Sequence, residues 1–432
     1  MKYFERNLLE EIKKWIDRRE IIAIKGPRQS GKTTLLEMLK EWLIKEKGIE
    51  KENVIYITFE DREILEKFDE NVKDFIKFFI KDENKKYYFL IDEAHLSKDL
   101  GKNLKFIYDT HKNIKLIITG SSSMEIISST AKFLVGRIFS FELYPLNFYE
   151  FVKAKDESLF RIYKEKTEIV RNFIFNEIDF EVPENDIFIK DLLRLLEEYL
   201  TFGGYPEVVK SNNKEEKMII LKNIFNTYLE KDIISFLHIT DTAKFRKLVS
   251  ALSSLIGDLI TYETLANVCD TYFKDIIYLL DVLEETYVIM LLKPFHKNLV
   301  TELRKNPKVY FIDYGIRNYA INNFTDFNLR QDAGKLVENF VMNEIRTKSE
   351  NISINFWRTT AKAEVDFVLS DAKKVIPIEV KFQKMKKPKI SRSLHSFISS
   401  YSPKYAIVFT RDLWGEKKIG NTKVKFIPVV YI

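Results

Sequence analysis

Residues suited to binding a polyphosphate occur in one glycine-rich loop, which reads Gly26-Pro-Arg-Gln-Ser-Gly-Lys-Thr-Thr34. Its two glycines let backbone amides approach a triphosphate, and a helix beginning near Lys32 adds a favourable dipole. Lys32 is expected to reach the β and γ phosphates, and Thr33 to ligate Mg²⁺. The loop predicts an ATP or GTP site formed by Gly26, Pro27, Arg28, Gln29, Ser30, Gly31, Lys32, Thr33 and Thr34.

Two carboxylates that would complete this site end an apolar run that begins at Tyr87. Asp92 is expected to hold the Mg²⁺ shell, and Glu93 to orient or deprotonate the attacking water. A later apolar run ends at Thr119 and is followed by a glycine and three serines. Ser121 is the preferred γ-phosphate sensor, and a turn-capping role fits its position equally well.

A second group of charged residues lies in the last hundred residues. A hairpin that pairs Ser370 with Val375 would place Asp366 opposite Glu379, with Lys381 on the same face. Two carboxylates that lie directly opposite each other on paired strands repel each other unless a divalent cation lies between them. The pattern therefore predicts Mg²⁺ or Mn²⁺. With Lys381 beside the metal, such a group could hydrolyse phosphodiesters.

The elements that must position these residues follow from the apolar periodicity. Residues 1–154 alternate apolar runs with amphipathic helical patterns, which is typical of an α/β fold with a parallel sheet. Residues 155–240 are helical, with breaks at Gly203-Gly204 and Pro206, and suggest a lid. Residues 241–322 predict three helices and a hairpin, the order of a winged helix-turn-helix. Residues 323–432 predict a separate α/β domain.

Charge in residues 241–322 does not favour the reading of DNA bases. Lys274, in the helix expected at 271–285, is opposed by Asp270, Asp275, Asp281, Glu284 and Glu285, which is poor chemistry for a phosphate-lined groove. A basic rim on the following hairpin could hold a duplex backbone instead; it consists of Lys293, His296, Lys297, Arg304, Lys305 and Lys308. A further basic run could contact DNA or be a solvated face; it consists of Lys384, Lys386, Lys387, Lys389 and Arg392.

Composition restricts the class of protein. The 432 residues include 70 basic and 64 acidic ones, so the net charge of +6 does not itself indicate nucleic acid. The single cysteine, Cys269, excludes an internal disulfide and favours the cytoplasm. No stretch approaches the roughly 18 apolar residues that span a bilayer, so membrane insertion is not expected. Abundant Lys, Glu and Ile with few Gln resembles the composition of an archaeal or other thermophile.

Further motifs make the chain similar to a known family. They are Leu134-Val-Gly-Arg137, Tyr144-Pro-Leu-Asn-Phe-Tyr-Glu-Phe151, Gly203-Gly-Tyr-Pro-Glu-Val208, Tyr228-Leu-Glu-Lys-Asp-Ile233 and Arg304-Lys-Asn-Pro-Lys-Val-Tyr-Phe-Ile-Asp313. With the nucleotide motifs, they resemble prokaryotic and archaeal AAA+ ATPases of the AAA-14 type, which carry a C-terminal domain of unknown function numbered 4143. The resemblance implies ATP rather than GTP, a sheet ordered 5-1-4-3-2, and a possible homo-oligomer. It also implies that Arg137 is an arginine finger, although an ion pair at its strand is equally compatible.

The spacing of Asp366, Glu379 and Lys381 resembles that of PD-(D/E)xK nucleases, with Glu338 at the position of their additional helix glutamate. The resemblance implies a restriction-endonuclease-like fold with a metal held by Glu338, Asp366 and Glu379. The proline that usually precedes the first aspartate is absent. The alternatives are an ordinary amphipathic hairpin with a Glu379–Lys381 surface pair, and an exposed helix residue at position 338.

Two functions are compatible with these patterns. The first is an ATP-driven enzyme that acts on double-stranded DNA without strong sequence specificity, through a winged helix and a metal-dependent nuclease-like domain. The second is a nucleotide-gated switch whose C-terminal domain is a non-catalytic platform for DNA or a protein partner. The effect of Asp366→Ala beyond thermal stability distinguishes the two.

Overall fold

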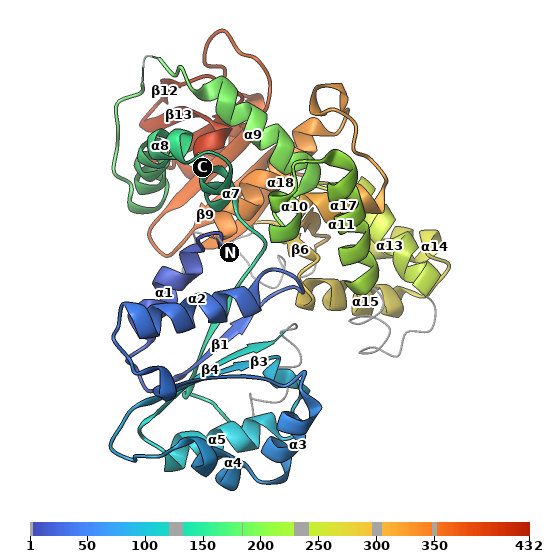
Figure 1. Cartoon of the computed structure of the whole chain (residues 1–432). Helices are drawn as coiled ribbons and strands as arrows, with labels where there is room; N and C mark the ends of the chain where they lie inside the picture. Colours follow the sequence, from blue (N-terminus) through green and yellow to red (C-terminus); the bar gives the residue numbers. More distant parts are fainter. Residues whose placement is uncertain (1–2, 121–132, 184, 229–241, 296–304, 348–351) are drawn as a thin grey trace. The chain divides into compact units, whose positions relative to one another are not determined.

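The structure is a computed structural model that describes residues 3–120, 133–183, 185–228, 242–295, 305–347 and 352–432 (Figure 1). Ser121 and three members of the expected basic rim, His296, Lys297 and Arg304, lie outside these residues. The chain forms two compact units. The first comprises residues 1–146 with the short segments 205–207 and 285–288, and the second comprises 147–204, 208–284 and 289–432. The domain boundaries expected from the sequence stay predictions.

A five-stranded parallel sheet forms the centre of the first unit. Its strands are β1 (Ile21–Lys25), β2 (Val54–Thr58), β3 (Tyr87–Asp92), β4 (Ile114–Gly120) and β5 (Ile138–Glu142). They lie in the order β2-β3-β4-β1-β5, and all neighbours are parallel. This confirms the expected order 5-1-4-3-2. The carboxyl ends of β1, β3 and β4 therefore meet at one edge of the sheet.

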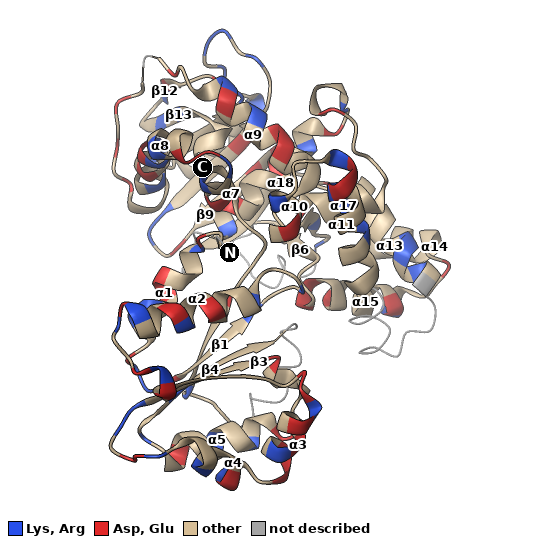
Figure 2. Ribbon diagram, viewed as in Figure 1, with Lys and Arg blue, Asp and Glu red and all other residues tan. Residues whose placement is uncertain are grey.

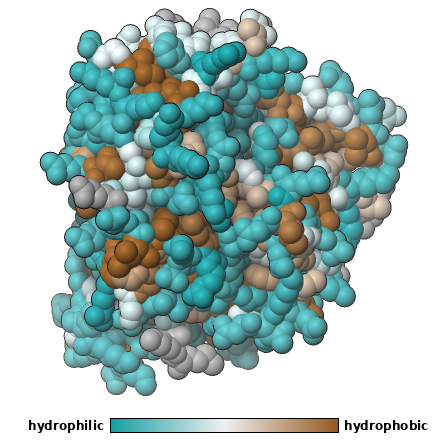
Figure 3. All heavy atoms as spheres, turned by 90° about the horizontal axis from the view of Figure 1, so that it is seen from above, coloured by the Kyte–Doolittle hydropathy of each residue, from teal (hydrophilic) through white to brown (hydrophobic). Residues whose placement is uncertain are grey.

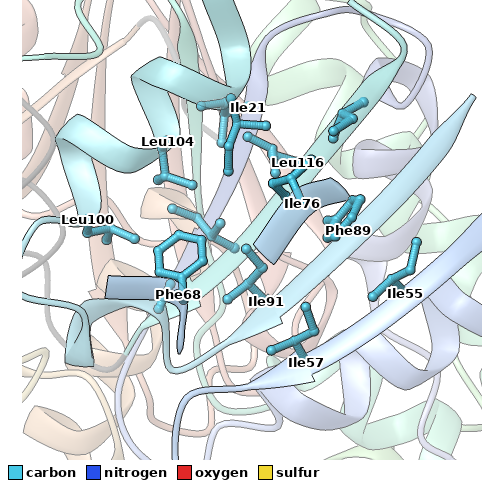
Figure 4. Packing of buried hydrophobic residues seen from close by; sticks show 14 of the residues in the cluster. Ile21, Ile55, Ile57, Phe68, Ile76, Phe89, Ile91, Leu100, Leu104 and Leu116 are labelled. Carbon is cyan, nitrogen blue, oxygen red and sulfur yellow. The ribbon is translucent and has the colours of Figure 1, made fainter. Parts of the chain in front are cut away.

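Helices cover both faces of this sheet. Apolar residues of α1 (Asn7–Trp15) and α2 (Lys32–Lys45) pack on one face. On the other face lie α3 (Arg62–Glu70), α4 (Val72–Phe79) and α5 (Leu100–Thr110). Figure 4 shows Phe68, Ile76 and Leu104 from these helices against Phe89 and Ile91 of β3. Strands buried on both faces read as continuous apolar runs, which is why the sequence identified them.

The helices that follow belong to the second unit. They are α7 (Phe148–Lys155), α8 (Glu157–Asn176), α9 (Ile189–Phe202), α10 (Pro206–Lys210, which starts in the first unit) and α11 (Lys214–Thr227). Aromatic pairs join them to the C-terminal part of the chain: Phe148 with Phe340 at 5.4 Å and Tyr163 with Tyr431 at 6.0 Å between ring centroids. These helices thus share a core with the C-terminal domain, an association that the sequence did not predict.

The predicted three helices and hairpin of residues 241–322 are present. The helices are α13 (Thr242–Ser254), α14 (Tyr262–Val268) and α15 (Phe273–Glu285), and the hairpin joins β6 (Ile289–Leu292) to β7 (Lys308–Phe311). The hairpin strands are antiparallel and pair Met290 with Tyr310. A further helix, α17 (Tyr314–Ala320), follows directly. The winged-helix interpretation of this order stays a prediction.

The C-terminal part of the second unit is built on a six-stranded mixed sheet. Its elements are α18 (Ala333–Arg346), β8 (Ser353–Arg358), β9 (Glu364–Ser370), β10 (Val375–Lys381), α19 (Arg392–Tyr401), β11 (Tyr405–Thr410), β12 (Gly415–Ile419) and β13 (Thr422–Pro428), followed by a 3-10 turn at Val429–Tyr431. The order is β12-β13-β11-β10-β9-β8. The predicted pairing of Ser370 with Val375 is confirmed. The sequence analysis did not identify β8.

The surface is predominantly hydrophilic on the face drawn in Figure 3, with hydrophobic patches between the polar residues. Among the described residues, no helix combines the length and the apolar character needed to cross a membrane.

Candidate functional site

The glycine-rich loop connects the end of β1 to the start of α2, as predicted. Gly26 has φ +150°, and a Cβ there would lie 2.1 Å from the carbonyl oxygen of Leu143, so only glycine fits. Gly31 has φ +98° and precedes the first residue of α2. Gln29 adopts φ +60°, a left-handed conformation that a side chain makes costly. The loop is therefore held in a bent shape that exposes the amino end of α2.

Lys32 lies within the curve of this loop. Its Nζ donates hydrogen bonds to the carbonyl oxygens of Gly26 and Pro27, both at 2.9 Å, and the residue is buried. Ser30 is also buried, and its Oγ has no hydrogen-bond partner among the described residues. The loop thus brings an ammonium group and a hydroxyl together at the amino end of a helix, where phosphate oxygens are favourably bound.

Asp92 stands at the end of β3, beside the first turn of α2. Its Oδ2 accepts hydrogen bonds from Thr33 Oγ1 at 2.6 Å and from Tyr56 OH at 3.2 Å. Its Oδ1 accepts a further bond from the hydroxyl of Thr119, at the end of β4. Residues on three neighbouring strands therefore hold the buried carboxylate of Asp92 next to the hydroxyl of Thr33. The sequence analysis assigned these two residues to the same Mg²⁺ ion.

Glu93 follows in a left-handed conformation, with φ +51°. Its backbone amide donates to Thr119 Oγ1 at 3.1 Å, which holds the turn in place. Burial raises the pKa of Glu93, Lys32 lowers it, and the neighbouring charge of Asp92 raises it, so that the pKa lies above its ordinary value. The Oε2 atom lies 3.2 Å from Nδ1 of His95. A carboxyl group with a raised pKa is suited to accept a proton.

Arg6 also supports the loop, and the sequence analysis did not identify it. Its Nη1 donates to the carbonyl oxygen of Ser30 at 2.8 Å, and its Nη2 donates to that of Tyr144 at 2.5 Å. The side chain is buried. Because the contacts are to backbone carbonyls far away in the sequence, no local motif marks Arg6; the signal was an arginine just before the first amphipathic helix.

The remaining loop residues lie around this centre. Arg28 and Thr34 are half-buried and Thr33 is exposed.

Arg137 precedes β5 at the amino edge of the sheet, opposite the edge from which the glycine-rich loop leaves β1. Its Nε lies 3.3 Å from Asp109 Oδ1, which is the ion pair that the sequence allowed as its alternative role. Within its own subunit, Arg137 is therefore not part of the candidate nucleotide site.

Of the C-terminal carboxylates, Glu338 and Glu379 are buried and Asp366 is half-buried, and this corrects the expected surface pair. Glu379 is 3% exposed and lies 3.0 Å from Lys381 Nζ. Asp366 accepts the backbone amide of Val380 at 2.7 Å. Burial, with the nearby charge of Glu338, raises the pKa of Asp366 to about 7. Glu338, only 7% exposed, is not an exposed helix residue either.

Lys308 enters this group from β7 and is not part of a basic rim, because it is 1% exposed. Its Nζ lies 3.0 Å from Glu338 Oε1 and 2.7 Å from Glu364 Oε1. An ammonium group at hydrogen-bond distance from two carboxylates repels a divalent cation. Among the described residues, no three His, Cys, Asp or Glu side chains are arranged to hold a metal. As arranged, Glu338, Asp366 and Glu379 do not fit the expected Mg²⁺ or Mn²⁺.

Of the described residues of the expected basic rim, Lys305 is exposed and Lys293 is half-buried, and the expected basic run after β10 is exposed throughout. Lys384, Lys386, Lys387 and Lys389, with Arg392, are exposed in the segment that follows β10. By contrast, the charged residues of α15 are mainly acidic (Figure 2), as the sequence indicated. It also exposes Tyr278 and Ile277, with Tyr272 just before it.

Comparison with known proteins agrees with the first unit's geometry. Residues 18–152 match an AAA domain, and residues 193–326 and 333–431 match two domains of unknown function, DUF8612 and DUF4143. An uncharacterized protein of Haemophilus influenzae is 26% identical over 385 residues, which cover 87% of this chain and 86% of that protein. An uncharacterized protein of Methanocaldococcus jannaschii is 27% identical over 358 residues, covering 81% and 72%.

Among solved structures, a Walker-type ATPase of Pyrococcus abyssi aligns with a TM-score of 0.41 at 15% identity, over 74% of this chain and 96% of that one. The family matches establish that the chain carries an AAA-type P-loop ATPase domain followed by a C-terminal DUF4143 domain.

Proposed function

We propose that the chain is a nucleotide-gated switch, in which ATP binding and hydrolysis in the AAA-type domain control what the second unit binds. Lys32 would contact the β and γ phosphates, and the backbone amides of Gly26 to Thr34, apart from Pro27, would donate hydrogen bonds to the phosphate oxygens. Glu93 would accept the proton of the attacking water. The observation that carries the proposal is the contact of Thr33 with Asp92 beside the amino end of α2.

The residues around Asp92 fit Mg²⁺. The carboxylate of Asp92 and the hydroxyl of Thr33 are 2.6 Å apart. The other polar groups in contact with Asp92 are the hydroxyls of Tyr56 and Thr119, so the surroundings of the carboxylate consist of oxygen atoms. Oxygen ligands in small number are what Mg²⁺ uses when it is bound together with nucleotide phosphates. When present, the ion would neutralise charge on the phosphates, while Thr33 and Asp92 hold it.

For the C-terminal domain we favour a binding role over catalysis. The order of α18, β8, β9, β10, α19 and β11, with Glu379 and Lys381 on β10, keeps the resemblance to PD-(D/E)xK nucleases open as an alternative. The arrangement of Lys308 against the carboxylates does not support metal-dependent cleavage. The exposed basic segment 384–392 supports contact with a phosphate backbone, so double-stranded DNA without sequence preference is the proposed ligand.

The ATPase part is tested with two variants that separate binding from turnover. Lys32→Ala should lose binding of a fluorescent ATP analogue. Glu93→Gln should bind the analogue but turn over ATP about 100- to 10,000-fold more slowly, because the proton acceptor is gone. Unchanged turnover in Glu93→Gln, or unchanged binding in Lys32→Ala, would exclude these roles.

The choice between switch and nuclease is tested on supercoiled plasmid with Mg²⁺ or Mn²⁺. The switch predicts ATP-dependent changes in DNA affinity and no nicking by wild type. Nicking that disappears in Asp366→Ala would establish the nuclease hypothesis instead.

A further inference from the structure

We propose that Lys308 is a resident counter-ion, which takes the place of a divalent cation among the carboxylates of Glu338, Glu364 and Asp366. These three residues, together with Glu379, are called the acidic cluster below. The proposal rests on the non-catalytic role suggested for this domain and explains it: the hairpin strand β7 supplies the positive charge that the cluster needs. It concerns metal binding alone and can be tested without nucleotide.

The periodicity of β7 places two side chains on the same carboxylate. Residues two apart on a strand point to the same face. Accordingly, Lys308 Nζ and Tyr310 OH both contact Glu338 Oε1, at 3.0 and 2.7 Å. Lys308 Nζ also lies 2.7 Å from Glu364 Oε1, so one ammonium group bridges α18 and β9. A bridging position between carboxylates from two elements is what a bound cation would occupy.

The strand is fixed in this position by α18. The side chain of Asn339 accepts the backbone amide of Phe311 at 2.7 Å and donates to its carbonyl oxygen, also at 2.7 Å. Asn343 donates to the same carbonyl oxygen at 3.1 Å. These buried amides take the place of a neighbouring strand at the end of β7. Lys308 therefore reaches the cluster on a backbone that is itself held by the helix carrying Glu338.

Side chains compensate the charges of three members of the cluster, whereas Asp366 accepts the backbone amide of Val380. Glu364 has Arg358 at 3.2 Å in addition to Lys308, and Glu338 has Lys335 at 3.8 Å. Glu379 is paired with Lys381 at 3.0 Å. One further oxygen of the cluster, Glu379 Oε2, is buried without a hydrogen-bond partner among the described residues. If the ammonium group of Lys308 were removed, a cation could bind between Glu338 and Glu364, where Lys308 now bridges them.

Electrostatics gives the consequence of such a removal. Burial lowers the pKa of Lys308, but Glu338, Asp366 and Glu364 outweigh burial and raise the pKa, so the group stays charged at neutral pH. Replacing it with an apolar side chain deprives the buried carboxylate of Glu338 of its nearest ammonium group and removes one of the two basic partners of Glu364. Oxygen ligands in excess of positive charge are the usual binding site of a hard divalent cation. A variant lacking this charge should therefore acquire a metal site.

The test measures Mn²⁺ binding to the nucleotide-free full chain by electron paramagnetic resonance. Lys308→Met replaces the ammonium-bearing side chain with an unbranched, uncharged one that is one atom shorter. This variant should bind one Mn²⁺ in the cluster with an affinity at least about tenfold higher than that of the wild-type cluster. Lys308→Arg keeps the charge and should behave as wild type. Adding Asp366→Asn to Lys308→Met should weaken the new site about 10- to 100-fold.

Two results would overturn the proposal. One is a wild-type Mn²⁺ site that Asp366→Asn removes, because the native cluster would then already accept a metal. This measurement needs no substitution at Lys308 and so decides the question even where Lys308→Met fails to fold. The other is a folded Lys308→Met protein, verified by circular dichroism, that gains no site. If the wild-type protein showed no ATPase activity, this would count against the proposed switch and would not affect either metal result.

Discussion

Arg6 shows how a residue outside the nucleotide motif can determine the shape of the loop. Its guanidinium joins the carbonyl oxygen of Ser30 to that of Tyr144, so the loop between β1 and α2 is tied to the segment after β5. The bond to the Ser30 carbonyl oxygen fixes the orientation of the peptide group that joins Ser30 to Gly31. A rigid donor fork suits this task better than a flexible ammonium group.

We expect Arg6→Ala to raise the KM for ATP by roughly tenfold, because the loop amides would lose their fixed orientation. Steady-state ATPase measurements with varied ATP give the value. Arg19→Ala is a matched control, since Arg19 also donates to a backbone carbonyl, that of Tyr108, but at an exposed position. Equal effects of the two substitutions would contradict a specific role for Arg6.

At the scale of elements, Asp313 links α17 to the end of α9. Its Oδ1 accepts the amide of Ile316 at 3.0 Å and its Oδ2 accepts that of Gly204 at 2.8 Å. A Cβ on Gly203, which has φ +79°, would lie 2.3 Å from Asp313 Oδ1. The Gly203-Gly204 motif thus packs directly against the buried carboxylate of Asp313. This gives a structural reason for a motif that the sequence linked only to a family.

This contact should make stability depend on pH. Burial raises the pKa of Asp313 to about 6, and hydrogen bonds from Gly204 and Ile316 only partly oppose it. The folded state then binds the proton more tightly than the unfolded state, so this group's contribution is lost as pH rises from about 4 through 6. The loss is on the order of 3 kcal/mol. Relative to wild type, Asp313→Asn should gain free energy of unfolding between pH 4.5 and 7.5.

Urea unfolding at the two pH values measures the difference, and Asp326→Asn, at an exposed aspartate, serves as the control. A pH dependence that is the same in wild type and Asp313→Asn would show that the carboxyl of Asp313 does not titrate in this range.

The exposed segment 384–392 gives a prediction for DNA binding. Each lysine that neutralises a phosphate releases a counter-ion, so Lys386→Glu with Lys387→Glu should weaken binding to duplex DNA and reduce the salt slope by about two. Fluorescence anisotropy over a range of salt concentrations measures both. Lys417→Glu with Lys418→Glu changes the same charge at exposed positions of β12. If the two double variants weaken binding equally, the effect is one of net charge and not of the segment.

The elements differ in how far the sequence predicted them. The strands of the first unit and the β9–β10 hairpin follow from apolar runs and alternation, which are local signals. The contacts of Lys308 with Glu338 and of Arg6 with Ser30 join residues 30 and 24 positions apart, and no local pattern specifies them. For the same reason, Lys308 was predicted to lie on a basic rim. Its neighbours in the sequence are basic, whereas its neighbours in space are acidic.

At the scale of the whole molecule, the role of Arg137 decides whether the ATPase acts alone. Arg137 lies at the amino edge of the sheet and the glycine-rich loop at the carboxyl edge, so the arginine can reach a γ-phosphate only in another subunit. A guanidinium accelerates hydrolysis where charge develops on the phosphate. Acting in trans would make the active site a property of the oligomer, although each chain carries a complete set of loop residues.

We expect Arg137→Ala to lose most of its ATPase activity, and an equimolar mixture with inactive Lys32→Ala to recover it in part. In the mixture, an intact loop from one variant can meet an intact arginine from the other at roughly a quarter of the interfaces, so about a quarter of the wild-type rate should return. Asp109→Ala breaks the ion pair but keeps the arginine, and should remain active. If Asp109→Ala and Arg137→Ala are impaired alike and mixing restores nothing, Arg137 serves only to anchor β5 through Asp109.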